Sequence, residues 1–301
     1  MKSTINKKNV VGIARGEKWT NGKSTGQPAV LVFVEKKEPL GNLSADDIIE
    51  DEIDGLPTDV VGKTGRISAL GIRPQNLPAR PWVRASRTKK RNPKKRTRPI
   101  MGGISISHRK VTAGTLGVLC RDKKKQVVLL SNNHVIANTN KAKIGDPIYQ
   151  PGTYDSRRKP KNAIGYLAAF TKLKNGVNQD SAIARVKTSF SKTINRIGRP
   201  KRKIRGAKVG LKVIKSGRTT GVTKGKIIAK SGTFRVWYGS NRSYKIKSCI
   251  VTTGMSAGGD SGSLLMDRKR RPIGLLFAGS SAITLHSPIK PILKRYKISI
   301  L

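Results

Sequence analysis

The stretch Gly259-Asp260-Ser261-Gly262-Ser263 does most to decide how this chain folds. A serine between small, turn-forming residues suits an acyl-transfer nucleophile, because a tight turn exposes its hydroxyl. In such a turn the backbone N–H groups of Gly259 and Ser261 can face the oxygen that becomes negative in a tetrahedral intermediate. Gly/Asp/Ser clusters are also common in ordinary turns, so this stretch needs support from elsewhere in the chain.

A histidine and an aspartate upstream give that support. Residues 127–130 form an apolar run that predicts a buried strand, and the polar stretch after it carries His134. Asp180 opens the alternating stretch 180–186, which also predicts a strand. The order His134, Asp180, Ser261 thus supplies a general base, a carboxylate to orient it and a nucleophile.

These residues resemble the catalytic motifs of trypsin-like serine peptidases of the chymotrypsin fold. Three wider segments are similar to a bacterial-type subgroup related to the plant narrow-leaf protein. They are Leu130-Ser131-Asn132-Asn133-His134-Val135, Lys215-Ser216-Gly217-Arg218-Thr219-Thr220-Gly221 and Thr253-Gly254-Met255-Ser256-Ala257-Gly258-Gly259-Asp260-Ser261-Gly262-Ser263. The resemblance covers most of residues 102–301, and residues 10–66 resemble the N-terminal region of such proteins. It implies two antiparallel β-barrels with a catalytic cleft between them.

The resemblance also implies roles for single residues. His134, Asp180 and Ser261 form the catalytic triad, and Gly259 and Ser261 supply the oxyanion hole. The substrate pocket has Met255 at its base, and its wall strand carries Phe277, Ala278 and Gly279. An apolar base cannot pair a substrate Lys or Arg, which favours a small or medium apolar residue. The alternative is a polar or acidic residue, if His286 lies near the same pocket.

Glycine-rich, aromatic-poor composition and short apolar segments predict a mainly β fold. The resemblance implies that this fold is a chymotrypsin-like double β-barrel. A small α/β N-terminal unit is expected over residues 1–66, with Ser44 as a helix N-cap. Residues 67–101 are expected to form a basic linker or arm, and residues 102–301 the peptidase domain. The strands expected in that domain are Ile104–Ser107, Thr115–Cys120, Gln126–Leu130, Ala182–Val186, Ile227–Ala229, Phe234–Tyr238 and Ile273–Phe277.

The charge of the chain is extreme and uneven. It holds 63 Lys and Arg against 16 Asp and Glu, a formal net charge of +47. Residues 1–60 carry 8 basic against 10 acidic residues, and residues 61–301 carry 55 against 6. Such a charge predicts a negatively charged partner, which could be nucleic acid or another polyanion, an acidic protein or an anionic membrane surface. Adaptation to an unusual ionic milieu would give the same charge. The candidate polyanion-binding residues are Lys89, Lys90, Arg91, Lys94, Lys95 and Arg96; the alternative is a solvated arm with only non-specific binding.

Two functions remain open at this point. The first is a serine endopeptidase acting through the triad and an acyl-enzyme on a protein or peptide substrate. The second is a catalytically silent protein on a peptidase fold that binds nucleic acid or another polyanion. No cofactor and no metal site is expected, and a homo-oligomer stays open.

Location and cysteine chemistry follow from simpler features. The chain has no apolar run of 18 residues and no apolar leader, so we expect no transmembrane segment, no signal peptide and a cytoplasmic location. Cys120 and Cys249 are far apart in the sequence, which favours buried thiols over a disulfide.

Overall fold

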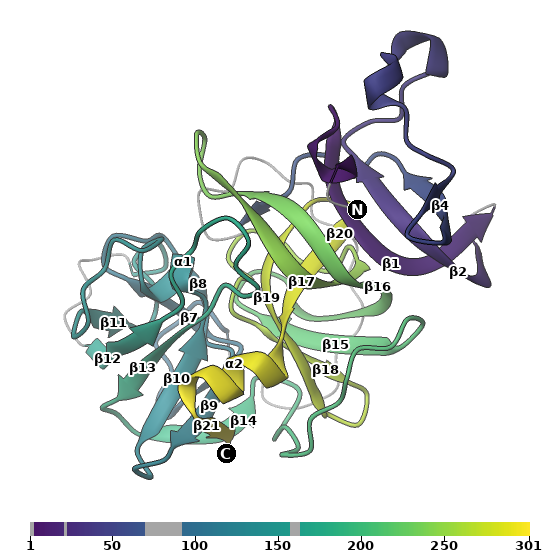
Figure 1. The fold of residues 1–301 in the computed structure, drawn as a ribbon. Coiled ribbons are helices and arrows are strands. Elements are labelled where there is room, and N and C mark those ends of the chain that lie inside the picture. Colours follow the sequence, from purple (N-terminus) through teal and green to yellow (C-terminus); the bar gives the residue numbers. More distant parts are fainter. Residues whose placement is uncertain (1–2, 21–22, 70–91, 157–162) are drawn as a thin grey trace.

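The protein is mainly β and contains two β-barrels that lie side by side, as the sequence predicted (Figure 1). The computed structural model describes residues 3–20, 23–69, 92–156 and 163–301. Lys89, Lys90 and Arg91 of the expected basic arm lie outside these residues. The boundaries that we expect at residues 66 and 101 stay predictions.

The first barrel is an eight-stranded sheet in the order β21-β9-β10-β13-β12-β11-β7-β8. Its strands are β7 (Ser105–His108), β8 (Gly114–Thr115), β9 (Val118–Asp122), β10 (Val127–Ser131), β11 (Pro147–Tyr149), β12 (Ala163–Phe170), β13 (Ala182–Val186) and β21 (Ile298–Ile300). The short helix α1 (Asn133–Ile136) follows β10 directly. Apolar side chains such as Leu129, Val135 and Ile148 fill its core.

The second barrel is a closed ring, because β15 pairs with both β18 and β16. Its strands are β15 (Lys212–Gly217), β16 (Gly221–Trp237), β17 (Ser243–Thr253), β18 (Leu264–Asp267), β19 (Pro272–Gly279) and β20 (Ile283–Pro288). The two strands expected over residues 227–229 and 234–238 both fall on the single strand β16, which ends one residue earlier than expected, at Trp237. The Ser231-Gly232 pair between them forms an irregularity in the pairing with β17 instead of a turn, with Ser231 at φ 55°.

The N-terminal strands extend the sheet of the second barrel. β1 (Val10–Thr20) pairs antiparallel with β16, and β2 (Lys23–Val34), β4 (Leu56–Val61) and β3 (Glu52–Ile53) follow outward. The run 29–34 is apolar throughout because both faces are covered. Its side chains alternate between the barrel core, which receives Leu31 and Phe33, and an outer cluster, which receives Val30 and Val32.

The helix expected after Ser44 is a single 3₁₀ turn, η3 (Ala45–Asp47). The Ser44 hydroxyl donates to the carboxylate of Asp47 at 2.9 Å and caps no backbone N–H. Two further single turns, η1 (Thr4–Asn6) and η2 (Leu40–Asn42), complete the helical content of the described residues before β5 (Ser68–Ala69). In this part of the described chain the N-terminal unit therefore holds strands and 3₁₀ turns but no α-helix.

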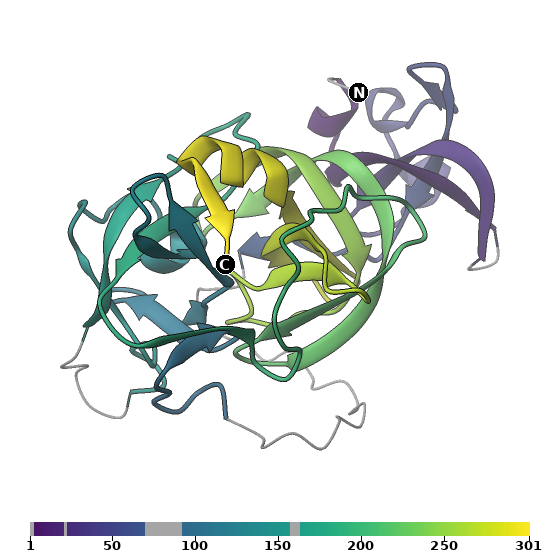
Figure 2. The ribbon, with the colours of Figure 1, turned by 90° about the horizontal axis from the view of Figure 1, so that it is seen from below.

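The C-terminus ties the barrels together. Helix α2 (Ile289–Tyr296) follows β20, lies across the junction of the barrels in both views, and leads to β21, which pairs with β9 (Figures 1 and 2). An apolar cluster between the barrels joins Leu130 and Ile300 of the first to Leu264 and Leu275 of the second. The parallel pair β6 (Ile100–Gly102) and β14 (Phe190–Ile194) completes the strands.

Cys120 and Cys249 are free, fully buried thiols, which confirms the expectation for them. Burial raises the pKa of both thiols far above the usual range. Among the described residues, no helix is long and apolar enough to cross a membrane.

Candidate active site

His134 and Asp180 are brought together by two neighbouring strands of the first barrel. β10 ends at Ser131 and pairs antiparallel with β13, where Ala182 lies opposite Ser131. The residues just after β10 and just before β13 therefore meet at one edge of the barrel. There Nδ1 of His134 lies 2.6 Å from Oδ2 of Asp180, and both side chains are 0% exposed.

Further donors hold the Asp180 carboxylate in place. Oδ1 accepts the backbone N–H of Asn133 at 2.7 Å and that of His134 at 3.4 Å. Oδ2 accepts the hydroxyl of Tyr238 at 3.0 Å, and the Tyr238 ring stands edge-on to the imidazole of His134. Burial, with the Asp180 charge beside it, raises the pKa of Tyr238 well above its usual value, so this hydroxyl stays a donor. These contacts compensate the buried carboxylate and fix its direction.

Ser261 lies in the loop between β17 and β18 and is buried. Its hydroxyl donates to the backbone carbonyl of Phe277 at 3.1 Å. Nε2 of His134, the atom that would accept the serine proton, has no hydrogen-bond partner in the part of the chain that the structure describes. The structure thus joins His134 to Asp180 but does not form the bond from Ser261 to His134. Such bonds are often open in unliganded sites and close with substrate.

The loop around Ser261 needs glycine at two positions. Gly259 has φ +95° and Gly262 has φ +96°, a region that other residues rarely adopt. A Cβ on Gly259 would also lie 2.6 Å from Oγ1 of Thr219. The N–H groups of Gly259 and Ser261 donate to no other residue within the described ranges. Two backbone donors of this loop are therefore without an acceptor among the described residues.

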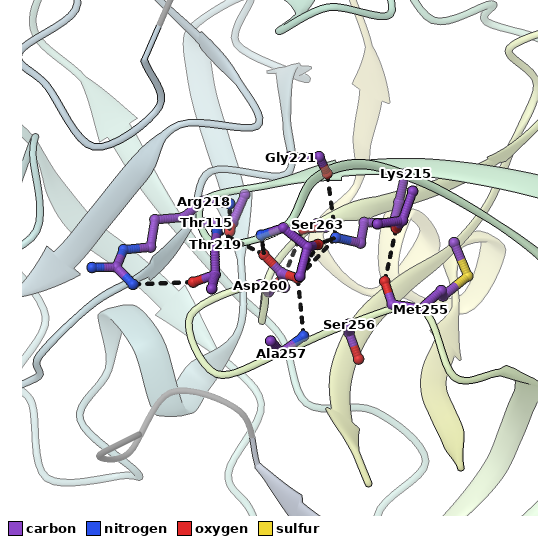
Figure 3. A network of polar contacts seen from close by, with 12 residues as sticks. Thr115, Lys215, Arg218, Thr219, Gly221, Met255, Ser256, Ala257, Asp260 and Ser263 are labelled. Atoms are coloured by element: carbon purple, nitrogen blue, oxygen red, sulfur yellow. Dashed lines mark hydrogen bonds and ion pairs between the residues drawn. The ribbon is translucent and has the colours of Figure 1, made fainter. Parts of the chain in front are cut away.

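Asp260, next to the candidate nucleophile, forms a buried ion pair with Lys215 of β15 (Figure 3). Lys215 Nζ lies 2.8 Å from Oδ2 of Asp260, and both side chains are 0% exposed. The carboxylate also accepts the N–H groups of Thr219, Thr220 and Ala257 and the hydroxyl of Thr220. This network fixes the loop 257–261 from inside the second barrel.

The charges of this pair are set by opposing effects. Burial alone would raise the pKa of Asp260, but the charge of Lys215 and the hydrogen bonds around the carboxylate hold it below its usual value. Burial lowers the pKa of Lys215, and the attraction to Asp260 works against that shift. The ionised carboxylate is therefore the form that the network stabilises.

A second ion pair connects Arg218, which follows β15 directly, to the first barrel. Arg218 pairs with Asp155, whose Oδ2 also accepts the hydroxyl of Ser105 in β7 at 2.6 Å. The Thr115 hydroxyl accepts the N–H of Arg218 at 3.0 Å and donates to the carbonyl of Gly259 at 2.8 Å. The candidate oxyanion loop is thus held from both barrels.

Sequence reasoning did not assign roles to Lys215, Arg218 or Tyr238. Lys215 and Arg218 lie in the segment 215–221, which resembles the bacterial-type peptidase subgroup but gave no role for either residue. A signal for Lys215 exists, since it stands in the strand-like run Lys212-Val213-Ile214-Lys215, where a buried lysine requires an acidic partner. No local pattern marks Tyr238, because its partner comes from the other barrel.

The residues expected to form the substrate pocket are all buried. Met255 packs against Val213 and Ile227 in one apolar cluster, whereas Phe277 and Ala278 belong to another. Gly279 ends β19 and is buried as well. Met255 and the pair Phe277–Ala278 are therefore buried in two separate apolar clusters of the second barrel.

His286 is 0% exposed within β20, and its Nε2 lies 3.1 Å from Oγ1 of Thr252. Burial, together with the charge of Lys215, lowers the pKa of His286 to about 3. A neutral, fully buried imidazole is poorly suited to pair with an acidic substrate, so this arrangement does not support the alternative pocket preference.

Three of the six candidate polyanion-binding residues are described. Lys94, Lys95 and Arg96 are exposed on the turn that leads into β6. A shallow hollow there is lined by Asn92, Lys95, Arg96, Thr97 and Arg98. Among the described residues, no group of three or more His, Cys, Asp or Glu side chains is arranged to hold a metal ion.

Comparison with solved structures shows similarity to bacterial serine proteases. Thermobifida fusca protease A is 21% identical with a TM-score of 0.51, over 67% of this chain and 98% of that one. Nocardiopsis protease is 19% identical with a TM-score of 0.50, over 67% and 98%. A protease described as specific for glutamic acid and as using a histidine triad in substrate binding is 21% identical with a TM-score of 0.51, over 67% and 100%.

Identities this low show the fold alone. A search of curated proteins found no match. A family model described as Trypsin, however, matches residues 87–289, which is more than half of the chain. Fold, motif order and family model agree, and the chain belongs to the trypsin family.

Proposed function

We propose that this protein is a serine endopeptidase that hydrolyses peptide bonds through Ser261, His134 and Asp180 by way of an acyl-enzyme. One observation carries the proposal. The buried 2.6 Å contact between Asp180 and Nδ1 of His134 leaves Nε2 without a partner among the described residues. An imidazole oriented at one nitrogen and open at the other is suited to general-base catalysis.

In the first step the Ser261 hydroxyl changes its hydrogen-bond partner. The hydroxyl leaves the Phe277 carbonyl and donates to Nε2 of His134, which takes the proton as Oγ attacks the substrate carbonyl. Asp180 stabilises the imidazolium, which next protonates the leaving amine. Water attacks the acyl-enzyme in the reverse sequence and releases the carboxylate product.

The backbone N–H groups of Gly259 and Ser261 stabilise the tetrahedral oxyanion in this scheme. One such donor contributes about 3 kcal/mol to transition-state stabilisation in comparable enzymes. The donors must be fixed before the reaction, and the Lys215–Asp260 pair does that from the interior of the barrel.

For specificity we propose an uncharged, apolar primary pocket. Met255, Phe277 and Ala278 offer no acidic group to a substrate Lys or Arg. The neutral His286 offers no positive charge to an acidic residue. An apolar substrate residue therefore meets no unpaired charge at this position, and a charged one does not find a partner.

Labelling with a fluorophosphonate probe tests the proposal. Wild type is expected to label, and the variants Ser261→Ala and His134→Ala are expected not to. A folded wild-type sample that does not label would refute the assignment and leave a catalytically silent protein. Circular dichroism of all three samples provides the folding control.

A basic surface that binds polyanions is a second property that we propose, carried by the exposed turn with Lys94, Lys95 and Arg96. Exposed cations on one turn can neutralise phosphates or sulfates without reading a sequence. This binding is independent of Ser261, so it is expected to persist in Ser261→Ala.

A further inference from the structure

The short strand β5 (Ser68–Ala69) is inserted beside the candidate nucleophile. It pairs antiparallel with β19, with Ala69 opposite Ala278 and Ser68 opposite Gly279. On its other side Ser68 pairs with Trp237 of β16. A segment that precedes the first barrel in the sequence therefore lies between two strands of the second barrel.

The position of β5 relative to Ser261 follows from the register. Ala278 comes directly after Phe277, whose carbonyl accepts the Ser261 hydroxyl at 3.1 Å. Because the pairing is antiparallel, β5 runs from the level of Gly279 toward the level of Phe277. The strand thus points along β19 toward the nucleophile.

Several contacts hold β5 on this edge. The guanidinium of Arg66 lies 3.7 Å from the centre of the Trp237 ring and donates to the carbonyl of Ser240 at 2.8 Å. The carbonyl of Ile67 accepts the N–H of Trp237 at 2.9 Å. The Ile67 side chain is 0% exposed and that of Ala69 is 3% exposed, and both belong to the core cluster that contains Phe277 and Ala278.

We infer that the segment Arg66–Ala69 occupies the strand position that an extended peptide substrate requires on β19, and so competes with substrate. The inference rests on the proposed function and names its regulation and substrate class. A peptide that binds by adding a strand takes its main-chain hydrogen bonds from an open sheet edge. β5 already takes those bonds at Ala278 and Gly279, so the two strands exclude one another.

The residues of β5 and the preceding Ile67 indicate which peptide sequences fit the same position. A large aliphatic residue corresponds to the fully buried Ile67, and small residues correspond to Ser68 and Ala69. Extended peptides of the type aliphatic–small–small are therefore the class that this edge takes.

Arg66 is the residue to change, because its side chain is exposed while its contacts hold β5 (Arg66→Ala). The loss of a cation–π contact and of a hydrogen bond raises the population in which β5 has left the edge, and apparent affinity for a competing peptide rises with that population. The matched control is Arg242→Ala, which removes an exposed cation from the turn between β16 and β17, close in sequence to Trp237 and Ser240. Among the described residues, the Arg242 side chain makes no hydrogen bond or ring contact with β5.

The measurement is peptide binding to the background Ser261→Ala, so that hydrolysis plays no part. A peptide that copies residues 67–69, with a neutral fluorophore, is titrated at high salt and followed by anisotropy. Arg66→Ala in this background is expected to bind the peptide about five- to tenfold more tightly than Ser261→Ala alone. Arg242→Ala in the same background is expected to bind it with the affinity of Ser261→Ala alone. Equal affinity in all three would overturn the inference. Fluorophosphonate labelling of the corresponding proteins with Ser261 intact decides the proposed function separately.

Discussion

Replacing Lys215 by methionine tests whether the buried ion pair builds the candidate oxyanion loop. Both charged groups are 0% exposed, so Lys215→Met leaves Asp260 as a buried carboxylate without its cation. Breaking a buried pair from one side costs about 3–5 kcal/mol. Four hydrogen bonds to the carboxylate, from Thr219, Thr220 and Ala257, remain and compensate part of the charge. We therefore expect the lower end, about 3 kcal/mol.

The assay combines stability with reactivity. The free energy of unfolding is measured in urea, and the rate of fluorophosphonate labelling is measured in the folded state at low urea. Lys215→Met is expected to label at least tenfold more slowly, because the loop 257–261 relaxes and the two backbone donors lose their position. The exposed residue of the same strand gives the control, Lys212→Met, which is expected to leave both readouts within error.

A double variant separates charge burial from packing. Lys215→Met with Asp260→Asn removes both charges, so most of the lost stability is expected to return while labelling stays slow. A loss of less than about 1 kcal/mol in Lys215→Met, together with labelling at the wild-type rate, would refute this role of the ion pair.

Three further outcomes follow from the site and the surface. Tyr238→Phe removes the hydroxyl that donates to Asp180 at 3.0 Å, so kcat for a peptide ester is expected to fall about tenfold with KM unchanged; an unchanged kcat would exclude a positioning role. Burial lowers the pKa of His286 to about 3 in the folded protein, so its contribution to stability is complete above pH 6.5 and is lost as the pH falls toward 3. We expect the free energy of unfolding to fall by about 2 kcal/mol between pH 7 and 5 from this group. Urea titrations in which wild type and His286→Gln share one pH slope would contradict this. For duplex DNA, the logarithm of the binding constant falls linearly with the logarithm of the salt concentration. Replacing residues 94–96 with glutamine is expected to make that slope shallower by nearly 3, and an unchanged slope would place the binding elsewhere.

Several strands of both barrels could be predicted from local pattern. The strand expected over Ala182–Val186 is β13 with the same bounds, and those around residues 127–130 and 273–277 differ only at their ends. These segments carry both the apolar periodicity and the turn residues that bound a strand. The helix expected after Ser44 was not found, because its polar residues complete one turn through their own side chains and no packing extends it.

The candidate triad was predicted as a set of residue types in order, and the structure tests it in parts. The contact between His134 and Asp180 follows from two adjacent strand ends, which a pattern of strands does anticipate. The Ser261 hydroxyl donates to the Phe277 carbonyl of β19, and no pattern along the sequence predicts that partner.

By itself the sequence determined the family, the mainly β class and the identity of the candidate catalytic residues, because these depend on local composition and on motifs that each lie within a dozen residues. Only the tertiary structure decided that Lys215 neutralises Asp260, that Tyr238 supports Asp180 and that β5 covers the edge of β19. Each of these contacts joins residues between 45 and 211 positions apart, as Lys215 and Asp260, Tyr238 and Asp180, and Ser68 and Gly279 show. Their partners are chosen by how closed barrels and added strands pack, and no period along the chain encodes that choice.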